Sequence, residues 1–247
     1  MREQNKVLRF VVILGAVSVA LAVSAIGCTR AERGMMHGWG RVDGAGMTQA
    51  EASLSLREQF DLVEERIVRM QELMTDAQVQ ISSGLWKWGQ KGGAPIADVN
   101  VWSVPGMTSD NSYYLNIGRS IRPEGATGAK ADLDPMIAYF EQQGWKTEFV
   151  TLELEGVFGP DYLVRADTGD GYLVSWEVQA NGYYNMEVIS KTFWGDSSDL
   201  QAAVSDRIPK EARDIEESVP GVYVPFPDWD DPLVSAPDLL DHSGKGE

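Results

Sequence analysis

The stretch of sequence that decides the fold is Thr48–Ser83, TQAEASLSLREQFDLVEERIVRMQELMTDAQVQISS. Thr48 and Glu51 form a capping-box pattern, which marks the start of a helix. Apolar residues then recur at alternating spacings of four and three positions, on one helix face. This stripe consists of Leu56, Phe60, Val63, Ile67, Met70, Met74, Ala77 and Ile81. The pattern predicts an amphipathic helix about 50 Å long that ends near Gly84, since glycine takes the left-handed cap easily.

The apolar stripe has to be buried, and the sequence leaves two partners open for it. Its seven-residue repeat is compatible with a coiled coil, so one hypothesis is self-association of two chains through the 56–81 stripe. The positions that flank the stripe show no consistent pattern of complementary charge, however. This favours the alternative, in which the helix packs against a sheet of its own chain.

Short segments of alternating apolar residues predict that sheet. The first is Tyr114–Ile121, and a short helix follows it, with Asp134 as the N-cap and Pro135 at the first helical position. The later strands, separated by turn-forming residues, are Lys146–Glu155, Tyr162–Asp167, Tyr172–Gln179 and Tyr184–Phe193. This order predicts an α+β fold, in which a long N-terminal amphipathic helix and a short helix pack on an antiparallel sheet of about 4–5 strands.

The register of the last hairpin follows from its apolar residues. Trp176 and Val178 form one face of their strand, and Met186 of the next strand should join that face. A two-residue Asn-Gly turn would place Met186 on the opposite face. We therefore predict a three-residue loop over 181–183, with Val178 paired to Met186.

The first 28 residues have the layout of an export signal. A basic start is followed by an uncharged apolar run over 10–26, and Gly27 precedes Cys28, the single cysteine of the chain. This stretch resembles the signal of bacterial lipoproteins, which implies removal of residues 1–27 and acylation of Cys28 as the mature N-terminus. Two acyl chains on one cysteine anchor a protein stably to a membrane. An uncleaved signal anchor and an ordinary secretory signal are the alternatives.

Composition divides the rest of the chain. Residues 28–47 are rich in glycine and predict a flexible tether, residues 48–83 the long helix, and residues 84–205 the α+β domain. Residues 206–247 carry eleven acidic residues, four basic residues and six prolines, so we expect a tail that is mostly disordered or lies over the domain. Tyr223–Trp229 is the exception, because it can dock in an extended form, and docking on its own domain is favoured over docking on a partner.

Charge and residue counts argue against several classes of function. Removal of residues 1–27, which carry three basic residues and one acidic residue, changes the net charge from −16 to −18. Such a chain repels nucleic acid and anionic lipid, so we expect no nucleic-acid partner. The two histidines, His37 and His242, lie in the predicted tether and tail, which argues against a Ser-His-Asp triad or a zinc site. Neither a phosphate-binding nor a dinucleotide-binding glycine motif occurs, and we expect no cofactor and no metal.

Carboxylate chemistry is the enzymatic alternative that remains. Asp167–Gly169 is similar to the aspartic-protease triplet, but those enzymes need two such aspartates. Together with Asp170 and Gly171, the same residues favour a tight hairpin turn. Glu148, Glu153 and Glu155 are candidates for the acid and base of a glycosidase, and Glu153 and Glu155 share one strand face about 7 Å apart. A carboxylate-based cell-envelope hydrolase therefore stays the alternative hypothesis.

Aromatic residues offer a better lead to a binding function. If several of them align on an exposed sheet face, they would form a stacking surface for a sugar or a peptide. The alternative is that they fill the core and the sheet edges. The candidate surface consists of Trp86, Trp88, Trp102, Tyr113, Tyr183 and Trp194.

The whole layout resembles that of lipoproteins of Gram-positive actinobacteria, with a lipidation signal, a helix and a small α/β domain. Met136–Lys146, a short helix ending in Gly-Trp before a strand, contributes to this likeness. The resemblance implies location and layout alone. We therefore expect a non-enzymatic binding or scaffolding module, anchored to the outer side of the cell membrane through Cys28, with an envelope protein or a glycan as its partner.

Overall fold

The computed structural model describes residues 54–89, 93–98, 107–152 and 159–237. The predictions for the signal, for Cys28, for the tether and for the Thr48 cap lie outside these residues, as do those for Trp102 and for the pair Glu153 and Glu155.

The predicted long helix is present over a shorter range, as α2, Leu56–Gln78. A capping box closes its start, but the residues are Ser55 and Glu58: the backbone N–H of Ser55 donates to Glu58 Oε2 (2.8 Å), and that of Glu58 to Ser55 Oγ (3.3 Å). At its other end the helix stops before Gly84. The backbone N–H of Ser82 donates to the Gln78 carbonyl oxygen (2.9 Å), so the last turn is satisfied without a left-handed glycine.

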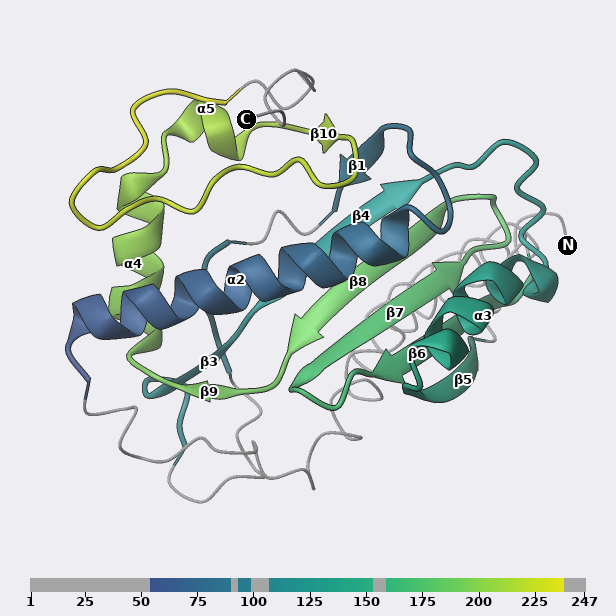
Figure 1. Ribbon diagram of the computed structural model, residues 1–247, viewed down its shortest axis with the longest axis horizontal. Coiled ribbons are helices and arrows are strands. Elements are labelled where there is room, and N and C mark those ends of the chain that lie inside the picture. Colours follow the sequence, from purple (N-terminus) through teal and green to yellow (C-terminus); the bar gives the residue numbers. More distant parts are fainter. Residues whose placement is uncertain (1–53, 90–92, 99–106, 153–158, 238–247) are drawn as a thin grey trace, which may run out of the picture. The chain divides into compact units, whose positions relative to one another are not determined.

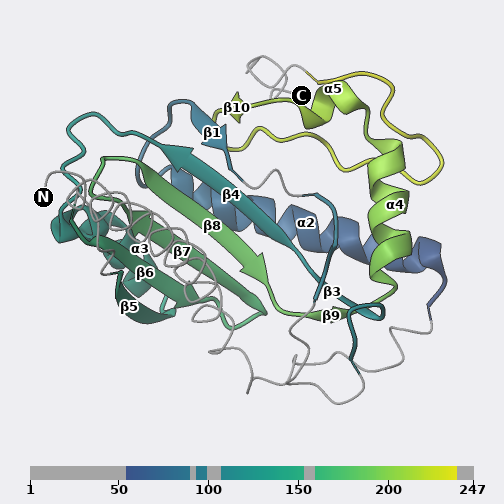
Figure 2. The same ribbon diagram turned by 180° about the vertical axis from the view of Figure 1, so that it is seen from behind.

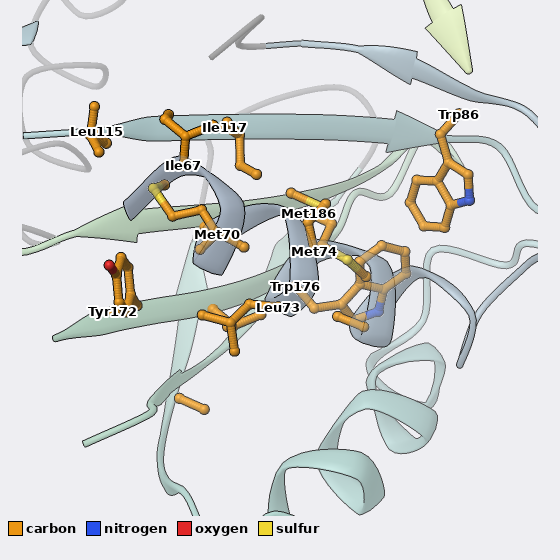
Figure 3. Packing of buried hydrophobic residues seen from close by; sticks show 14 of the residues in the cluster. Ile67, Met70, Leu73, Met74, Trp86, Leu115, Ile117, Tyr172, Trp176 and Met186 are labelled. Atoms are coloured by element: carbon orange, nitrogen blue, oxygen red, sulfur yellow. The ribbon is translucent and has the colours of Figure 1, made fainter. Parts of the chain in front are cut away.

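The apolar stripe of α2 is buried against the chain's own sheet, as the sequence favoured. Val63, Met70 and Met74 are fully buried, and Figure 3 shows Met70 and Met74 pointing toward Met186 and Trp176 of the strands. Self-association through the 56–81 stripe required these side chains to be exposed in the single chain, and they are not.

The sheets confirm a mixed fold of helices and antiparallel strands (Figure 1). Within the described residues, the main sheet has seven strands in the order β10-β1-β4-β8-β7-β6-β5. Its strands are β1 Trp86–Trp88, β4 Asn116–Ile121, β5 Lys146–Leu152, β6 Asp161–Asp167, β7 Tyr172–Val178, β8 Tyr184–Ser190 and β10 Glu217–Ser218. A second sheet, in the order β2-β3-β9, contains β2 Ile96–Ala97, β3 Ser112–Tyr114 and β9 Phe193–Trp194.

The main sheet is wider than the predicted four or five strands because two short strands extend one edge. β1 has three residues and β10 has two, too few to show a period of two. They pair with each other through Trp86–Ser218 and Lys87–Glu217, and β1 also pairs with β4. The edge therefore joins residues that lie about 130 positions apart in the sequence, as the indole-to-serine contact of Trp88 with Ser218 shows.

The described helices that cover the main sheet, α2 and α3, lie on one of its faces (Figures 1 and 2). α2 crosses β7 and β8, and α3, Asp134–Gln142, packs on β5 and β6 after the 3₁₀ helix η2, Lys130–Leu133. α4, Ser197–Arg207, packs beside α2 and begins at the N-cap Asp196. The short α5 spans Lys210–Arg213.

The predicted register of the β7–β8 hairpin is correct in its face and wrong in its pairs. Val178 pairs with Tyr184 and Trp176 with Met186, instead of Val178 with Met186. The observed shift is two residues, which leaves every side chain on the same face, so the apolar pattern cannot detect it. The observed pairing places the Tyr184 ring edge-on to Trp176, with the ring centroids 5.5 Å apart.

The prediction of a mostly disordered tail is wrong for residues 206–237, which the structure describes from α4 through α5 and β10 to an extended segment. Docking of the segment 223–229 on its own domain is confirmed. The rings of Phe226 and Trp229 lie 4.9 and 5.2 Å from that of Phe60, and the Tyr223 hydroxyl donates to the Gln71 carbonyl oxygen (3.0 Å). The composition of the tail does not reveal this order, because its aromatic contacts with the domain come from only three residues, Tyr223, Phe226 and Trp229.

We expect Trp229→Ala to destabilise the domain by about 2 kcal/mol, because it removes a partly buried ring from Phe60 and from the guanidinium of Arg207, 4.0 Å away. Val234→Ala is the control, since Val234 is 90% exposed, and it should change stability by less than about 0.5 kcal/mol. Urea unfolding of both variants measures the difference. Equal midpoints would contradict the packing role of the tail.

Candidate functional site

A buried arginine on the helix-facing side of the main sheet is the most unusual feature of the domain. Arg119 lies on β4 between Ile117 and Ile121 and pairs across the sheet with Met186 and Trp88. Because side chains alternate along a strand, Arg119 points to the same side as the two isoleucines. Its exposed fraction is 2%.

The surroundings of Arg119 are aromatic rather than acidic. Its Cζ lies 4.2 Å from the ring centroid of Trp88 and 5.2 Å from that of Tyr223. Rings at these distances attract a guanidinium through their π faces. Among the described residues, none forms an ion pair with Arg119.

Most of the hydrogen-bonding capacity of Arg119 is unused within the described residues. Nη1 donates to the carbonyl oxygen of Gly118 (2.8 Å). The buried Nε has no partner among them. A buried donor left unpaired is costly, and more so in a charged group, so this arrangement calls for a physical reason.

The charge of Arg119 persists despite its burial. Burial lowers the pKa of Arg119 to about 10, because a low-dielectric environment disfavours the charged form. Since this pKa is well above neutrality, the guanidinium stays protonated at pH 7. A permanent positive charge is therefore held inside the domain, and none of the described carboxylates pairs with it.

Arg119 lines a cavity of about 60 Å³, which we name the Arg119 cavity. Its walls come from α2, β1, β4, the α4–α5 region and the tail. They are mostly apolar, with Gln71, Tyr223 and the exposed Arg213 as polar members beside Arg119. The apolar walls include Ile67, Ile117, Ile208, Ala212 and Phe226.

The tail forms one wall of the Arg119 cavity and is fastened on both sides of it. Besides its bond to Gln71, the Tyr223 hydroxyl lies 3.0 Å from Thr75 Oγ1. Burial raises the pKa of Tyr223 to about 12, so the phenol stays neutral. On the other side the Trp88 indole donates to Ser218 Oγ (2.9 Å), and Ser218 Oγ donates to the Val222 carbonyl oxygen (2.8 Å). Both rings beside Arg119 are thus held in place by hydrogen bonds.

This arrangement can bind an anion. A guanidinium presents paired donors that match carboxylates and phosphates. None of the described residues that line the cavity is a carboxylate, a histidine or a cysteine. The described residues also contain no group of three or more metal-ligating side chains.

The members of the predicted aromatic surface that the structure describes do not form one exposed face. Trp86 is fully buried in the core, and Tyr113 and Trp194 are buried in the second sheet. Tyr183 is 39% exposed on the β7–β8 hairpin, with Cζ of Arg122 5.5 Å from its ring. Trp88 is the member that lines the Arg119 cavity. Core and edge filling therefore accounts for most of these residues.

The candidate carboxylates within the described residues have structural partners. Asp167–Gly169 forms the predicted hairpin turn, in which the Gly169 N–H donates to Asp167 Oδ1 (2.9 Å) and Gly169 has a φ of 84°. Asp170 pairs with Arg69 (2.9 Å). Glu148 pairs with Arg165 (2.6 Å) on the sheet face away from α2.

A second, wider pocket of about 200 Å³ lies beside Asp132, Trp176 and Tyr184. Asp132 Oδ2 accepts hydrogen bonds from the Tyr184 hydroxyl, from both Thr127 donors and from the Gly128 N–H. Although burial opposes it, these bonds lower the pKa of the Asp132 carboxyl. The Asp132 carboxylate thus finds its hydrogen-bond partners within the chain and orders its loop. It differs in this from Arg119, whose buried Nε has no partner among the described residues.

Sequence reasoning missed Arg119, although a signal was present. Ile117, Arg119 and Ile121 alternate in one strand, so a charged residue occupies a position in phase with the apolar face. A charge in that phase indicates either a buried cation or a strand edge.

Comparisons with known proteins leave the chain without a family. No family model matches the sequence, and no curated protein matches it. One solved structure with a matching trace is the crystal structure of the putative lipoprotein LppA from Mycobacterium tuberculosis, at 16% identity and a TM-score of 0.34. The match covers 62% of this chain and 87% of that chain. At this similarity the likeness assigns neither a site nor an activity here.

We expect Arg119→Met to stabilise the ligand-free domain by about 1 kcal/mol or more, because an apolar side chain of similar length removes a buried, unneutralised charge. Arg122→Met, at an exposed position, is the matched control and should be nearly neutral. Urea unfolding at pH 7 compares both with the parent chain. A loss of about 2 kcal/mol or more in Arg119→Met would instead show that the stacked arginine holds the fold together.

Proposed function

We propose that this protein is a lipid-anchored binding module that works outside the cytoplasm, and that its ligand site is the Arg119 cavity. The observation that carries the proposal is the buried Arg119 guanidinium, with a free Nε and no ion-pair partner among the described residues. Natural proteins keep costly arrangements of this kind chiefly where they serve function.

Binding is a better fit than catalysis for the residues at this site. Arg119 stays charged at neutral pH, so it can hold an anion but cannot shuttle a proton. The hydrolase alternative needs two carboxylates that converge in a cleft, about 5–10 Å apart. In the described part of the chain, Glu148 is paired with Arg165 and the lining of the Arg119 cavity is not acidic. These contacts support a non-enzymatic role.

The anchor in this proposal rests on the sequence. The apolar run before Cys28 and the Gly-rich residues 28–47 suit a lipidated cysteine followed by a tether that holds the domain away from the membrane surface. Within the described residues, no helix has both the length and the apolar character needed to cross a membrane. The partner that we propose is an envelope protein or a glycan that presents an anionic group to the cavity.

We expect Cys28→Ala to abolish membrane attachment. The native chain should carry the mass of a diacylglyceryl group and fractionate with membranes, whereas the variant should be released or remain an uncleaved precursor. Intact mass and membrane fractionation, measured side by side, decide this. Identical mass increments and identical fractionation of the two forms would remove the lipid anchor from the proposal and leave the binding site untouched.

We expect at least one small anion to raise the melting temperature of the Cys28→Ala chain by more than it raises that of the Cys28→Ala/Arg119→Met chain. Binding to the folded state alone stabilises it by mass action. The anions are acetate, propionate, phosphate and sulfate, each compared with chloride at constant ionic strength. If none of them distinguishes the two chains, the Arg119 cavity is not an anion site and the proposed binding function fails.

A further inference from the structure

The chemical class of the ligand follows from the part of Arg119 that is left free. Nη1 is engaged by the Gly118 carbonyl oxygen, and Nε has no partner among the described residues. The rings of Trp88 and Tyr223 crowd Cζ at 4.2 and 5.2 Å. Nη2 also has no hydrogen-bond partner among the described residues, so the edge formed by Nε and Nη2 is unpaired there. Two parallel N–H groups at such an edge match the two oxygens of a planar carboxylate.

Charge selects a monoanion for this edge. Among the described residues that line the cavity, Arg119 is the buried cation, and one negative charge neutralises it. A phosphate dianion would leave an excess charge among apolar walls, which is costly. Arg213 also lines the cavity, but it is exposed, so solvent screens its charge. The net charge of −16 disfavours a dianion further.

Size and wall chemistry limit what the carboxylate is attached to. A cavity of about 60 Å³ has room for roughly four water-sized atoms, which is a carboxylate and about one further carbon. The walls beyond the guanidinium are Ile67, Ile117, Ile208 and Phe226. The next atoms of the ligand must therefore be apolar and lead toward the rim.

Resting on the proposed binding function, we infer that the Arg119 cavity takes a monoanionic carboxylate on a short aliphatic group. Such a group is presented by a small free acid or by the C-terminus of a peptide that ends in a small apolar residue. In both cases the carboxylate oxygens accept hydrogen bonds from Nε–H and Nη2–H of Arg119, and the aliphatic carbons contact the isoleucine side chains of the walls.

The test observes Arg119 directly in the Cys28→Ala chain. The Nε–H resonance of Arg119 is followed by ¹H–¹⁵N NMR at pH 7 and constant ionic strength, and is assigned by its loss in Arg119→Met. The additions are propionate, its neutral analogue propionamide, inorganic phosphate, and the dipeptide Ala-Ala with a free or an amidated C-terminus. We expect propionate to shift this resonance and to saturate with a Kd of about millimolar order. Propionamide, phosphate and the amidated dipeptide should not shift it.

Two variants separate the shape of the donor from its charge. Arg119→Lys keeps the positive charge but loses the paired edge, and it should weaken propionate binding about tenfold or more. Arg122→Lys makes the same change at an exposed position and should leave binding unaltered. Because the main measurement is made on Arg119 itself, it stands even if Arg119→Lys does not fold.

The outcomes distinguish the inference from the function on which it rests. Binding of propionate alone supports a small acid, and binding of the free dipeptide as well supports a peptide C-terminus; both support the carboxylate. Phosphate binding as tightly as propionate, or propionamide binding equally well, overturns the carboxylate inference while the cavity remains a binding site. If no addition moves the Arg119 resonance, the inference and the proposed function fail together.

Discussion

Burial of one face of α2 on the main sheet is the contact on which the rest of the structure depends. An isolated helix of 23 residues gains little stability from its own hydrogen bonds. With Met70 and Met74 fully buried over β7 and β8, the same helix becomes a fixed support. The tail then rests on it, through Phe60 at one end and the Gln71 carbonyl oxygen in the middle. Disruption of the packing between the apolar face of α2 and the main sheet would therefore release the tail and open the Arg119 cavity.

The Arg119 cavity lies where α2, the sheet edge and the tail meet. The residue at this junction is charged, whereas its surroundings are apolar and aromatic. An apolar residue at position 119 would continue the face of Ile117 and Ile121. Arg119 instead keeps a charge where desolvation disfavours it, and two hydrogen-bonded aromatic rings hold it in place. A loss of stability at one residue that is offset by the contacts around it is typical of binding sites.

Much of the fold was predictable because its strongest elements are periodic. The α2 stripe, the strands from 146 onward and the α+β class all follow from local repeats of apolar residues. The two short strands at the sheet edge were not predictable, since two or three residues carry no period. The candidate site was missed for a related reason: its parts lie on β1, β4 and the tail, and sequence reasoning had sought one exposed aromatic face.

The sequence by itself determined which face of each regular element is apolar, because alternation and helical spacing are local properties of the chain. It also predicted a hairpin turn at Asp167–Gly169, and the structure contains this turn with Gly169 at a positive φ. Only the tertiary structure decided that the acidic tail is ordered over residues 206–237, and that Arg119 is enclosed without an acidic partner among the described residues. Those outcomes depend on contacts between distant segments, whose free energy no local pattern records.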